Sequence, residues 1–219
     1  KTGVDTGAGK NLLGTFHQPK AVFIDMTFLE TLPQREFTSG LAEIVKYGII
    51  EDPDLLATLE ENAAALQGRD PAILERVVSA SCRIKKGIVE IDETEKGLRR
   101  ILNFGHTVGH AVEAESGYAV SHGEAVAMGM AAAALLSERL RYLNAEDRDR
   151  IERAIERVGL PCRIPGDLDA GRLLARMEKD KKKENGRIHF VLLKKAGMPF
   201  VNGGVPLDVV RETIEAMRS

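Results

Sequence analysis

The 219-residue chain contains 43% apolar and 29% charged residues, a composition typical of a folded globular protein with a full hydrophobic core. Its formal net charge of −2 excludes a general attraction to nucleic acid or to an anionic membrane, so an anion would have to bind at a local cluster of cations. Charged residues interrupt every apolar run before about 18 residues, and no signal-peptide pattern is present. We therefore expect a cytoplasmic protein that does not span a membrane.

The first 30 residues predict loops and one strand. Glycines and Pro19 dominate residues 1–20, which indicates loops, and the sequence AVFID at residues 21–25 predicts a short strand. The chain starts at Lys1, inside a glycine-rich stretch, rather than at a methionine. We therefore expect that a longer N-terminal part of the protein is missing.

A helical pattern begins at Pro33. One helix is predicted by an apolar stripe that consists of Leu41, Ile44, Val45, Gly48 and Ile49. The stripe leaves Glu43 and Lys46 together on the opposite side, where an exposed i, i+3 ion pair is the simplest interpretation. Two further helices are expected to open at Asp52 and at Asp70, because each aspartate is an N-cap followed by proline, and the second helix should run to about Ile91.

The second half of the chain predicts more helices and one strand. Asn103 is expected to cap a helix that runs through Glu115, and Ser121 with Glu124 forms a capping box for an alanine-rich helix to about residue 142. Further helices are expected at residues 146–158 and 170–179 and from Pro206, and a turn at residues 185–186 leads into a strand at residues 187–193. The fold class is therefore mainly α with a small β element. Cys82 and Cys162 form no CxxC pair, and we expect both to be buried small hydrophobic residues.

Three of the five histidines lie between residues 106 and 122. In a helix, His106 and His110 would stand at i and i+4, project from one face and be able to bind a common ion. A catalytic zinc ion takes three ligands from the protein and keeps one position open for substrate. The candidate ligands are Glu43, His106, His110, Glu113, His122 and Glu124. Spacing alone does not choose among them, and His110 could instead be an acid or base that faces the substrate.

Polar and cationic residues around this cluster predict a site for an anion. Asn103, His106 and His110 fall at i, i+3 and i+7, which would place them on one helical face as the wall of a site. The cations that could hold a phosphate are Lys46, Lys85, Lys86, Arg99, Arg100 and the run of residues 179–183.

Several phrases of the chain closely resemble the C-terminal part of the 3-dehydroquinate synthases, which are sugar-phosphate cyclases. They are KTGVDTGAGKN, FLETLP, GLAEIVKYGII, IKKGIVEIDETEKGLRRILNFGHTVGHAVEAESGY and SHGEAVAMGM. The resemblance implies the C-terminal half of a two-domain fold, which is a multi-helix metal-binding domain with a small β element. Residues 1–30 would then be a remnant of the N-terminal nucleotide-binding domain with its linker, and residues 31–219 the helical metal- and substrate-binding domain.

The resemblance also implies roles for individual residues. It selects Glu43, His106 and His122 as ligands of Zn²⁺, or of another divalent ion such as Co²⁺, and assigns His110 to the substrate. The residues implied to contact the substrate are Lys46, Lys85, Arg99, Asn103, His110 and Lys181, with Lys182 as the alternative to Lys181. The residues implied to lie beside NAD or the substrate are Lys1, Lys10, Asn11, Phe28, Leu29, Glu30 and Thr31.

The implied activity is the conversion of 3-deoxy-D-arabino-heptulosonate 7-phosphate into 3-dehydroquinate and phosphate, a step of the shikimate pathway, with transient reduction of NAD in a homodimer. We expect that the chain alone has no turnover, because the cofactor domain would be absent. Three alternatives remain open. They are a sister cyclase with another sugar phosphate as substrate, a metal-dependent NAD-linked alcohol dehydrogenase of the glycerol type, and a non-catalytic helical module.

Overall fold

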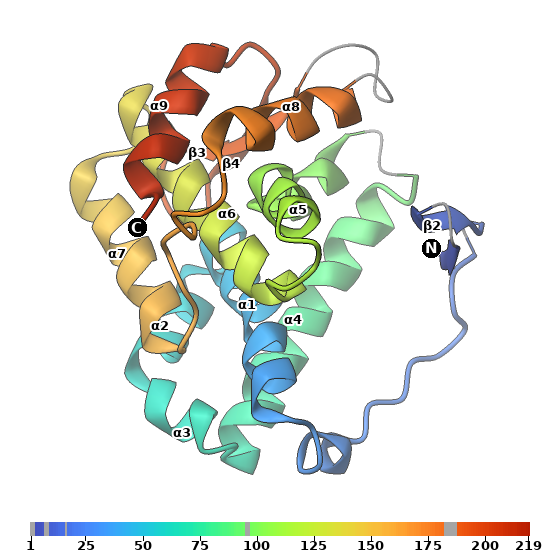
Figure 1. Cartoon of the computed structure of the whole chain (residues 1–219). Coiled ribbons are helices and arrows are strands. Elements are labelled where there is room, and N and C mark those ends of the chain that lie inside the picture. Colours follow the sequence, from blue (N-terminus) through green and yellow to red (C-terminus); the bar gives the residue numbers. More distant parts are fainter. Residues whose placement is uncertain (1–2, 7–8, 16, 95–96, 182–187) are drawn as a thin grey trace.

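Helices form most of the structure, as the sequence predicts. The computed structural model describes the chain except residues 1–2, 7–8, 16, 95–96 and 182–187, and its helices pack around a central one, α6 (Figure 1). In chain order the elements are β1 (Val4–Thr6), β2 (Gly9–Leu13), the 3₁₀ helix η1 (Met26–Leu29), α1 (Gln34–Ile50), α2 (Pro53–Glu61), α3 (Ala63–Gln67), α4 (Pro71–Ile91), the 3₁₀ helix η2 (Leu98–Asn103), α5 (His106–Glu115), α6 (His122–Arg139), α7 (Ala145–Arg157), α8 (Ala170–Lys181), β3 (Phe190–Leu193), β4 (Pro199–Asn202) and α9 (Leu207–Met217). None of the helices in these described ranges is long and apolar enough to cross a membrane.

The central helix α6 is buried on all sides. Residues 125–134, mostly alanine with glycine and methionine, are all buried, because α1, α5, α7, α9 and β3 pack around them. A helix that is apolar all round lies in the interior of a domain. The small side chains of α6 allow its neighbours to approach closely, which matters most at the candidate site.

Glycines bring α1 and α5 into backbone contact with α6. A Cβ atom added to Gly129 would lie 1.9 Å from the carbonyl oxygen of Gly105, at the start of α5. A Cβ atom added to Gly123 would lie 2.0 Å from the carbonyl oxygen of Ser39 in α1, and the Gly123 N–H donates to the Ser39 hydroxyl at 2.9 Å. Only glycine therefore permits these contacts, and three helices that are separate in the sequence meet at one place.

Side-chain caps fix several helix starts as the sequence predicts. Asp52 accepts the backbone N–H of Leu55, Asp70 accepts that of Ile73, and α4 ends at Ile91 as expected. Ser121 and Glu124 form the predicted capping box, which makes His122 the first residue of α6. The helices expected at residues 146–158 and 170–179 and after Pro206 are also present, with bounds that differ by one or two residues.

The N-terminal segment differs from the prediction. β1 and β2 form an antiparallel hairpin with Val4 opposite Leu13, where loops were expected, and Figure 1 shows this hairpin beside the bundle. The strand predicted at residues 21–25 is wrong, since this segment has no regular structure and Phe23 is 94% exposed. A strand needs a neighbour for its backbone hydrogen bonds, and within the described ranges no strand pairs with these residues.

The start of α5 also differs from the prediction. Asn103 ends η2 instead of capping α5, and Gly105, with φ of 79°, is the residue that precedes His106. The left-handed backbone at Gly105 separates the two helices. Asn103 therefore does not share a helical face with His106 and His110, which stand together on α5.

Two smaller elements complete the fold. β3 and β4 form an antiparallel hairpin with Val191 opposite Val201, and the Leu193 N–H donates to the Ser137 hydroxyl of α6 at 3.0 Å. β3 confirms the strand expected at residues 187–193 only from Phe190 onward, and residues 188–189 are not part of it. The predicted turn at residues 185–186 and residue 187 lie outside the described residues. Cys162 is buried as expected, but the prediction for Cys82 is wrong, because it is exposed on α4.

Candidate metal centre

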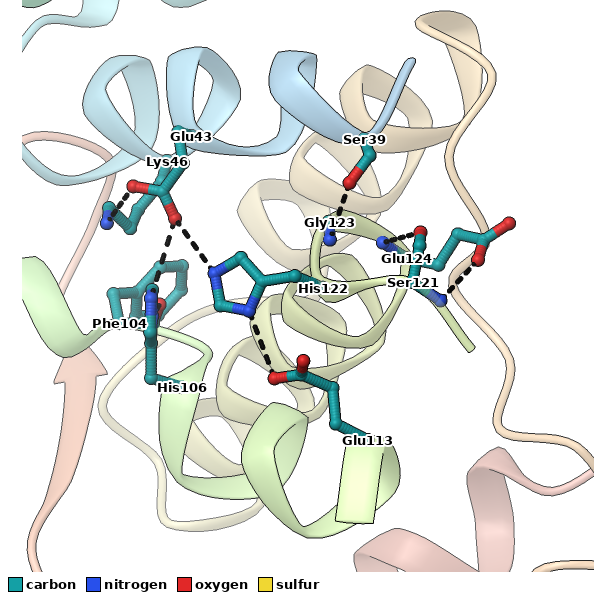
Figure 2. Close-up of polar contacts among 10 residues, drawn as sticks. All are labelled: Ser39, Glu43, Lys46, Phe104, His106, Glu113, Ser121, His122, Gly123 and Glu124. Carbon is teal, nitrogen blue, oxygen red and sulfur yellow. Dashed lines mark hydrogen bonds and ion pairs between the residues drawn. The ribbon is translucent and has the colours of Figure 1, made fainter. Parts of the chain in front are cut away.

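Three side chains from three helices meet where α1, α5 and α6 converge (Figure 2). Glu43 comes from the middle of α1, and His106 and His122 are the first residues of α5 and α6. The Glu43 Oε1 atom lies 3.5 Å from His106 Nε2 and 3.9 Å from His122 Nε2. One ligand atom from each of the three residues lies within 4.8 Å of the other two. The structure thus brings together the three residues that the resemblance selected.

Each histidine is oriented through its other ring nitrogen. His106 Nδ1 lies 3.1 Å from the carbonyl oxygen of Phe104, and His122 Nδ1 lies 3.0 Å from Glu113 Oε2. A carbonyl oxygen only accepts hydrogen bonds, so Nδ1 of His106 carries a proton, and the contact of His122 Nδ1 with the Glu113 carboxyl group is compatible with the same arrangement. The Nε2 atoms of both histidines face Glu43.

The Glu43 Oε1 atom is buried and has no hydrogen-bond partner. It faces the Nε2 atoms of both histidines, so three atoms that can act as metal ligands converge at one place. A buried acceptor of this kind is unusual unless an unseen water or ion satisfies it. Two imidazole nitrogens and one carboxylate oxygen are the ligands of a catalytic zinc site with an open position, so the residues present fit such an ion.

The second carboxylate oxygen of Glu43 is held by Lys46. Its Nζ atom donates to Glu43 Oε2 at 2.5 Å, and Lys46 is only 3% exposed. The expectation of an exposed ion pair is therefore wrong, because α1 is covered on this side as well. Burial raises the pKa of Glu43, but opposing interactions, of which the charge of Lys46 is the largest, bring it below its usual value, so that the carboxylate stays ionised.

Burial keeps His106 neutral. The side chain is 15% exposed, and its burial, together with the charge of Lys46, lowers the pKa of His106 to about 4. The neutral imidazole is the form that binds a metal ion. His106 therefore does not have to lose a proton before it coordinates an ion at neutral pH.

His110 lies beside the three residues. It is exposed on α5, with its ring centroid 5.3 Å from that of His106 and 6.2 Å from that of His122. It also belongs to a second group, His110, Glu113 and His122, whose ligand atoms are close enough for an ion. His106 and His110 thus lie next to each other on α5, as the i, i+4 spacing predicts. The buried oxygen without a hydrogen-bond partner, however, belongs to the group of Glu43, His106 and His122.

The other predicted substrate residues occupy different environments. Lys85 is exposed on α4. Burial is the main cause that lowers the pKa of Lys46, and the nearby charge of Lys85 lowers it further. Arg99 is buried in η2, and its guanidinium donates to the carbonyl oxygen of Glu93 at 2.8 Å. Asn103 is exposed at the end of η2. Lys181 is the last residue of α8, but its side chain is not described, and Lys182 lies outside the described residues.

The predicted cofactor residues lie apart from one another along the chain. Lys1 is outside the described residues, and Lys10 and Asn11 belong to β2, where their side chains are not described. Residues 28–31 lie in and after η1, which packs against α4 and whose carbonyl groups Arg69 binds. Phe28, Glu30 and Thr31 are exposed, and Leu29 is half-buried.

Two features of the site escape a reading of the sequence. Glu113 is predicted only as one of several candidate ligands, whereas in the structure it binds the far nitrogen of His122. The close contacts at Gly123 and Gly129 are the second feature. Glycine is unfavourable inside helices, so its repeated occurrence in α5 and α6 is the signal that indicates close helix packing.

The fold is that of enzymes that bind NAD⁺ and a divalent metal ion. The chain superimposes on 2-epi-5-epi-valiolone synthase from Streptomyces hygroscopicus subsp. jinggangensis 5008, solved with NAD⁺ and Zn²⁺, with a TM-score of 0.88 and 26% identity over 99% of this chain and 60% of that one. It also superimposes on 2-deoxy-scyllo-inosose synthase in complex with carbaglucose-6-phosphate, NAD⁺ and Co²⁺, with a TM-score of 0.83 and 25% identity over 98% of this chain and 61% of that one.

Sequence comparison defines the family. The family model for the C-terminal region of 3-dehydroquinate synthase matches residues 40–183, and the model for its N-terminal region matches residues 1–39. The 3-dehydroquinate synthase of Acidithiobacillus ferrooxidans (strain ATCC 53993 / BNL-5-31) is 46% identical over 99% of this chain and 59% of the relative, and that of Nostoc punctiforme is 44% identical over 99% and 61%. The chain belongs to the 3-dehydroquinate synthase family, and it spans about 60% of the length of these relatives.

Proposed function

We propose that Glu43, His106 and His122 bind a divalent metal ion, Zn²⁺ or Co²⁺. The observation that carries the proposal is the buried Glu43 Oε1 atom, which has no hydrogen-bond partner and faces two histidine Nε2 atoms. The metals bound in the two structural relatives support it, because Zn²⁺ is present in one and Co²⁺ in the other. Three protein ligands would leave the ion an open position for a substrate oxygen.

We further propose that the enzyme to which this chain belongs converts 3-deoxy-D-arabino-heptulosonate 7-phosphate into 3-dehydroquinate and phosphate. The ion would supply Lewis-acid stabilisation of developing negative charge, and NAD would accept a hydride and return it within one turnover. The relatives that carry this name are 44–46% identical to the chain. The sister cyclases are 25–26% identical, which favours this reaction over theirs.

We assign the surrounding side chains to the substrate. Exposed His110, next to the metal ligands, would relay or position protons, and exposed Asn103 would donate a hydrogen bond to a substrate hydroxyl. Lys85, Arg99 and Lys181 would neutralise the carboxylate and phosphate of the substrate, since cations stabilise such anions. Lys46 would hold Glu43 with its Oε1 atom toward the histidines while its own charge adds to this cationic environment.

We assign residues 1–30 to the nucleotide-binding domain and its linker, and residues 31–219 to the helical metal- and substrate-binding domain. Lys1, Lys10, Asn11 and residues 28–31 would line the NAD side of the site. The exposure of Phe28, Glu30 and Thr31 is compatible with such a role, because they are accessible to a ligand. A cytoplasmic homodimer remains a prediction from the family resemblance.

The reaction is tested on the longer enzyme that includes this chain. Heptulosonate phosphate and NAD are supplied, released phosphate is measured, and the product is identified by mass spectrometry and NMR. We expect 3-dehydroquinate, no net accumulation of NADH, and loss of activity in the Glu43→Ala variant. A different cyclic product would indicate a sister cyclase, and steady accumulation of NADH would indicate an alcohol dehydrogenase.

A further inference from the structure

Glu113 is a buried carboxylate that points at one of the proposed metal ligands. Its side chain is 7% exposed, and its Oε2 atom lies 3.0 Å from His122 Nδ1 (Figure 2). His106 and Glu113 stand seven residues apart on α5, so both project from the same face of that helix. One helix therefore carries a proposed ligand and, two turns later, the group that contacts the next ligand.

The two histidines differ in how firmly their surroundings hold them. The His106 side chain is 15% exposed and its Nδ1 atom faces a backbone carbonyl group, which cannot change its position freely. The His122 side chain is 45% exposed, and its partner is a side chain. The orientation of His122 thus depends on Glu113 to a greater extent than that of His106 depends on any side chain.

We propose that Glu113 is a positioning residue of the metal centre, and this inference rests on the proposed metal site. Its carboxylate accepts the Nδ1–H of His122, which fixes the proton on that nitrogen and leaves the lone pair on Nε2, toward Glu43. An ionised Glu113 would also make His122 a stronger electron-pair donor. Carboxylates that bind the far nitrogen of a ligating histidine act in this way in many zinc sites.

Glu115 provides a matched control for Glu113. It lies on the same helix, its side chain is 8% exposed, and it forms ion pairs with Arg172 at 3.0 Å and Arg176 at 2.5 Å, both on α8. Replacing either glutamate by glutamine converts one buried carboxyl group of α5 into an amide. Only the change at Glu113 alters the partner of a proposed metal ligand.

The test measures zinc affinity and the state of the His122 ring in the 219-residue chain. Affinity is determined by competition with a chromogenic chelator for the Glu113→Ala, Glu113→Gln and Glu115→Gln variants, and imidazole ¹⁵N NMR of the metal-free proteins reports which nitrogen of His122 carries the proton. We expect Glu113→Ala to weaken zinc binding by about 10–100-fold, and Glu113→Gln by less, because its amide oxygen still accepts a hydrogen bond. Glu115→Gln should bind zinc like the unaltered chain.

The outcomes separate this inference from the proposed metal site. If the unaltered chain binds zinc and Glu113→Ala binds it equally well, Glu113 does not position His122, while the metal site stands. If the unaltered chain itself does not bind zinc, the metal site fails and this inference falls with it. We expect the Nδ1–H form in the unaltered chain and its loss in Glu113→Ala, and an unchanged ring would overturn the proposal. Thermal unfolding of each variant checks that the fold is retained.

Discussion

The chemistry of the metal centre depends on where single protons reside. Phe104 accepts the Nδ1–H of His106, and we propose that Glu113 accepts that of His122, which would leave both Nε2 atoms as electron-pair donors toward Glu43. Lys46 occupies the other oxygen of Glu43 and keeps it from turning away. These contacts arrange the three ligand atoms before an ion arrives, which reduces the reorganisation that binding requires.

The first prediction distinguishes His106 from its neighbour His110. His106→Ala removes a ligand of the proposed site. Loss of a residue that only hydrogen-bonds to a metal ligand typically weakens metal binding by about 10–100-fold, so loss of the ligand itself should weaken zinc binding by at least that much. His110→Ala should leave zinc affinity nearly unchanged, because His110 is not one of the three proposed ligands. Competition with a chromogenic chelator measures both. The reverse order of affinities would assign the ion to the group of His110, Glu113 and His122 instead.

The second prediction concerns the two cysteines. Burial, together with the nearby carboxylates of Glu156 and Glu152, raises the pKa of Cys162 to about 12, whereas Cys82 is exposed on α4. Because the thiolate is the reactive form, a thiol reagent at pH 8 should modify Cys82 rapidly and reach Cys162 only after unfolding. The absorbance of the released chromophore measures this. The Cys82→Ser variant should show no rapid phase, and rapid modification of that variant would contradict the prediction.

At the level of elements, close helix packing places the ligands. α5 and α6 touch through their backbones at Gly105 and Gly129, and α6 touches α1 at Gly123. His106 directly follows one of these contacts and His122 directly precedes another. The separation of the ligand atoms is therefore set by backbone contacts as well as by the side chains themselves.

The third prediction tests this packing through Gly129→Ala. The added methyl group would lie 1.9 Å from the Gly105 carbonyl oxygen, so α5 and α6 must move apart, and the free energy of unfolding should fall by about 1–3 kcal/mol or more. Zinc affinity should also fall, because His106 and His122 lie on the two helices. Chemical denaturation and chelator competition measure the two effects. Gly87→Ala is the control, since within the described residues nothing beyond the adjoining backbone of α4 lies within 4 Å of its added methyl group, and a gain of about 0.5–1 kcal/mol is expected.

Local signals in the sequence predict the helices but not the assembly of the site. Asp52, Asp70 and Ser121 cap helices through bonds to nearby backbone atoms, so their effect can be recognised from a few residues. The break between η2 and α5 depends on the left-handed backbone of Gly105. The sequence suggests Asn103 as the N-cap instead, so the predicted start of α5 is too early. Spacing alone paired His106 with His110, because Glu43 is distant in the sequence and reaches His106 only through helix packing. The family resemblance, not the periodicity, selected Glu43.

At the scale of the whole molecule, the helical body and the segment before α1 differ in where their apolar side chains lie. The helical body has a continuous core, whereas the segment before α1 exposes apolar side chains, including Val22, Phe23 and Phe28. The failed strand at residues 21–25 belongs to this segment, where β propensity alone does not produce a strand without a paired neighbour.

The fourth prediction is that the 219-residue chain binds zinc but does not turn over substrate. All three proposed metal ligands come from helices of this chain, α1, α5 and α6, so we expect zinc binding to need no other part of the protein. The residues proposed to bind NAD lie in β2 and around η1, where Phe28, Glu30 and Thr31 are exposed, and a hydride acceptor requires an enclosed and oriented position. Phosphate release from heptulosonate phosphate with NAD and Zn²⁺ is measured for this chain and for the longer enzyme. Release by this chain at a rate near that of the longer enzyme would show that the helical part and the N-terminal hairpin suffice for the reaction. Zinc binding without phosphate release is the result we expect, because α1, α5 and α6 supply all three metal ligands, whereas Phe28, Glu30 and Thr31 on the proposed cofactor side are exposed.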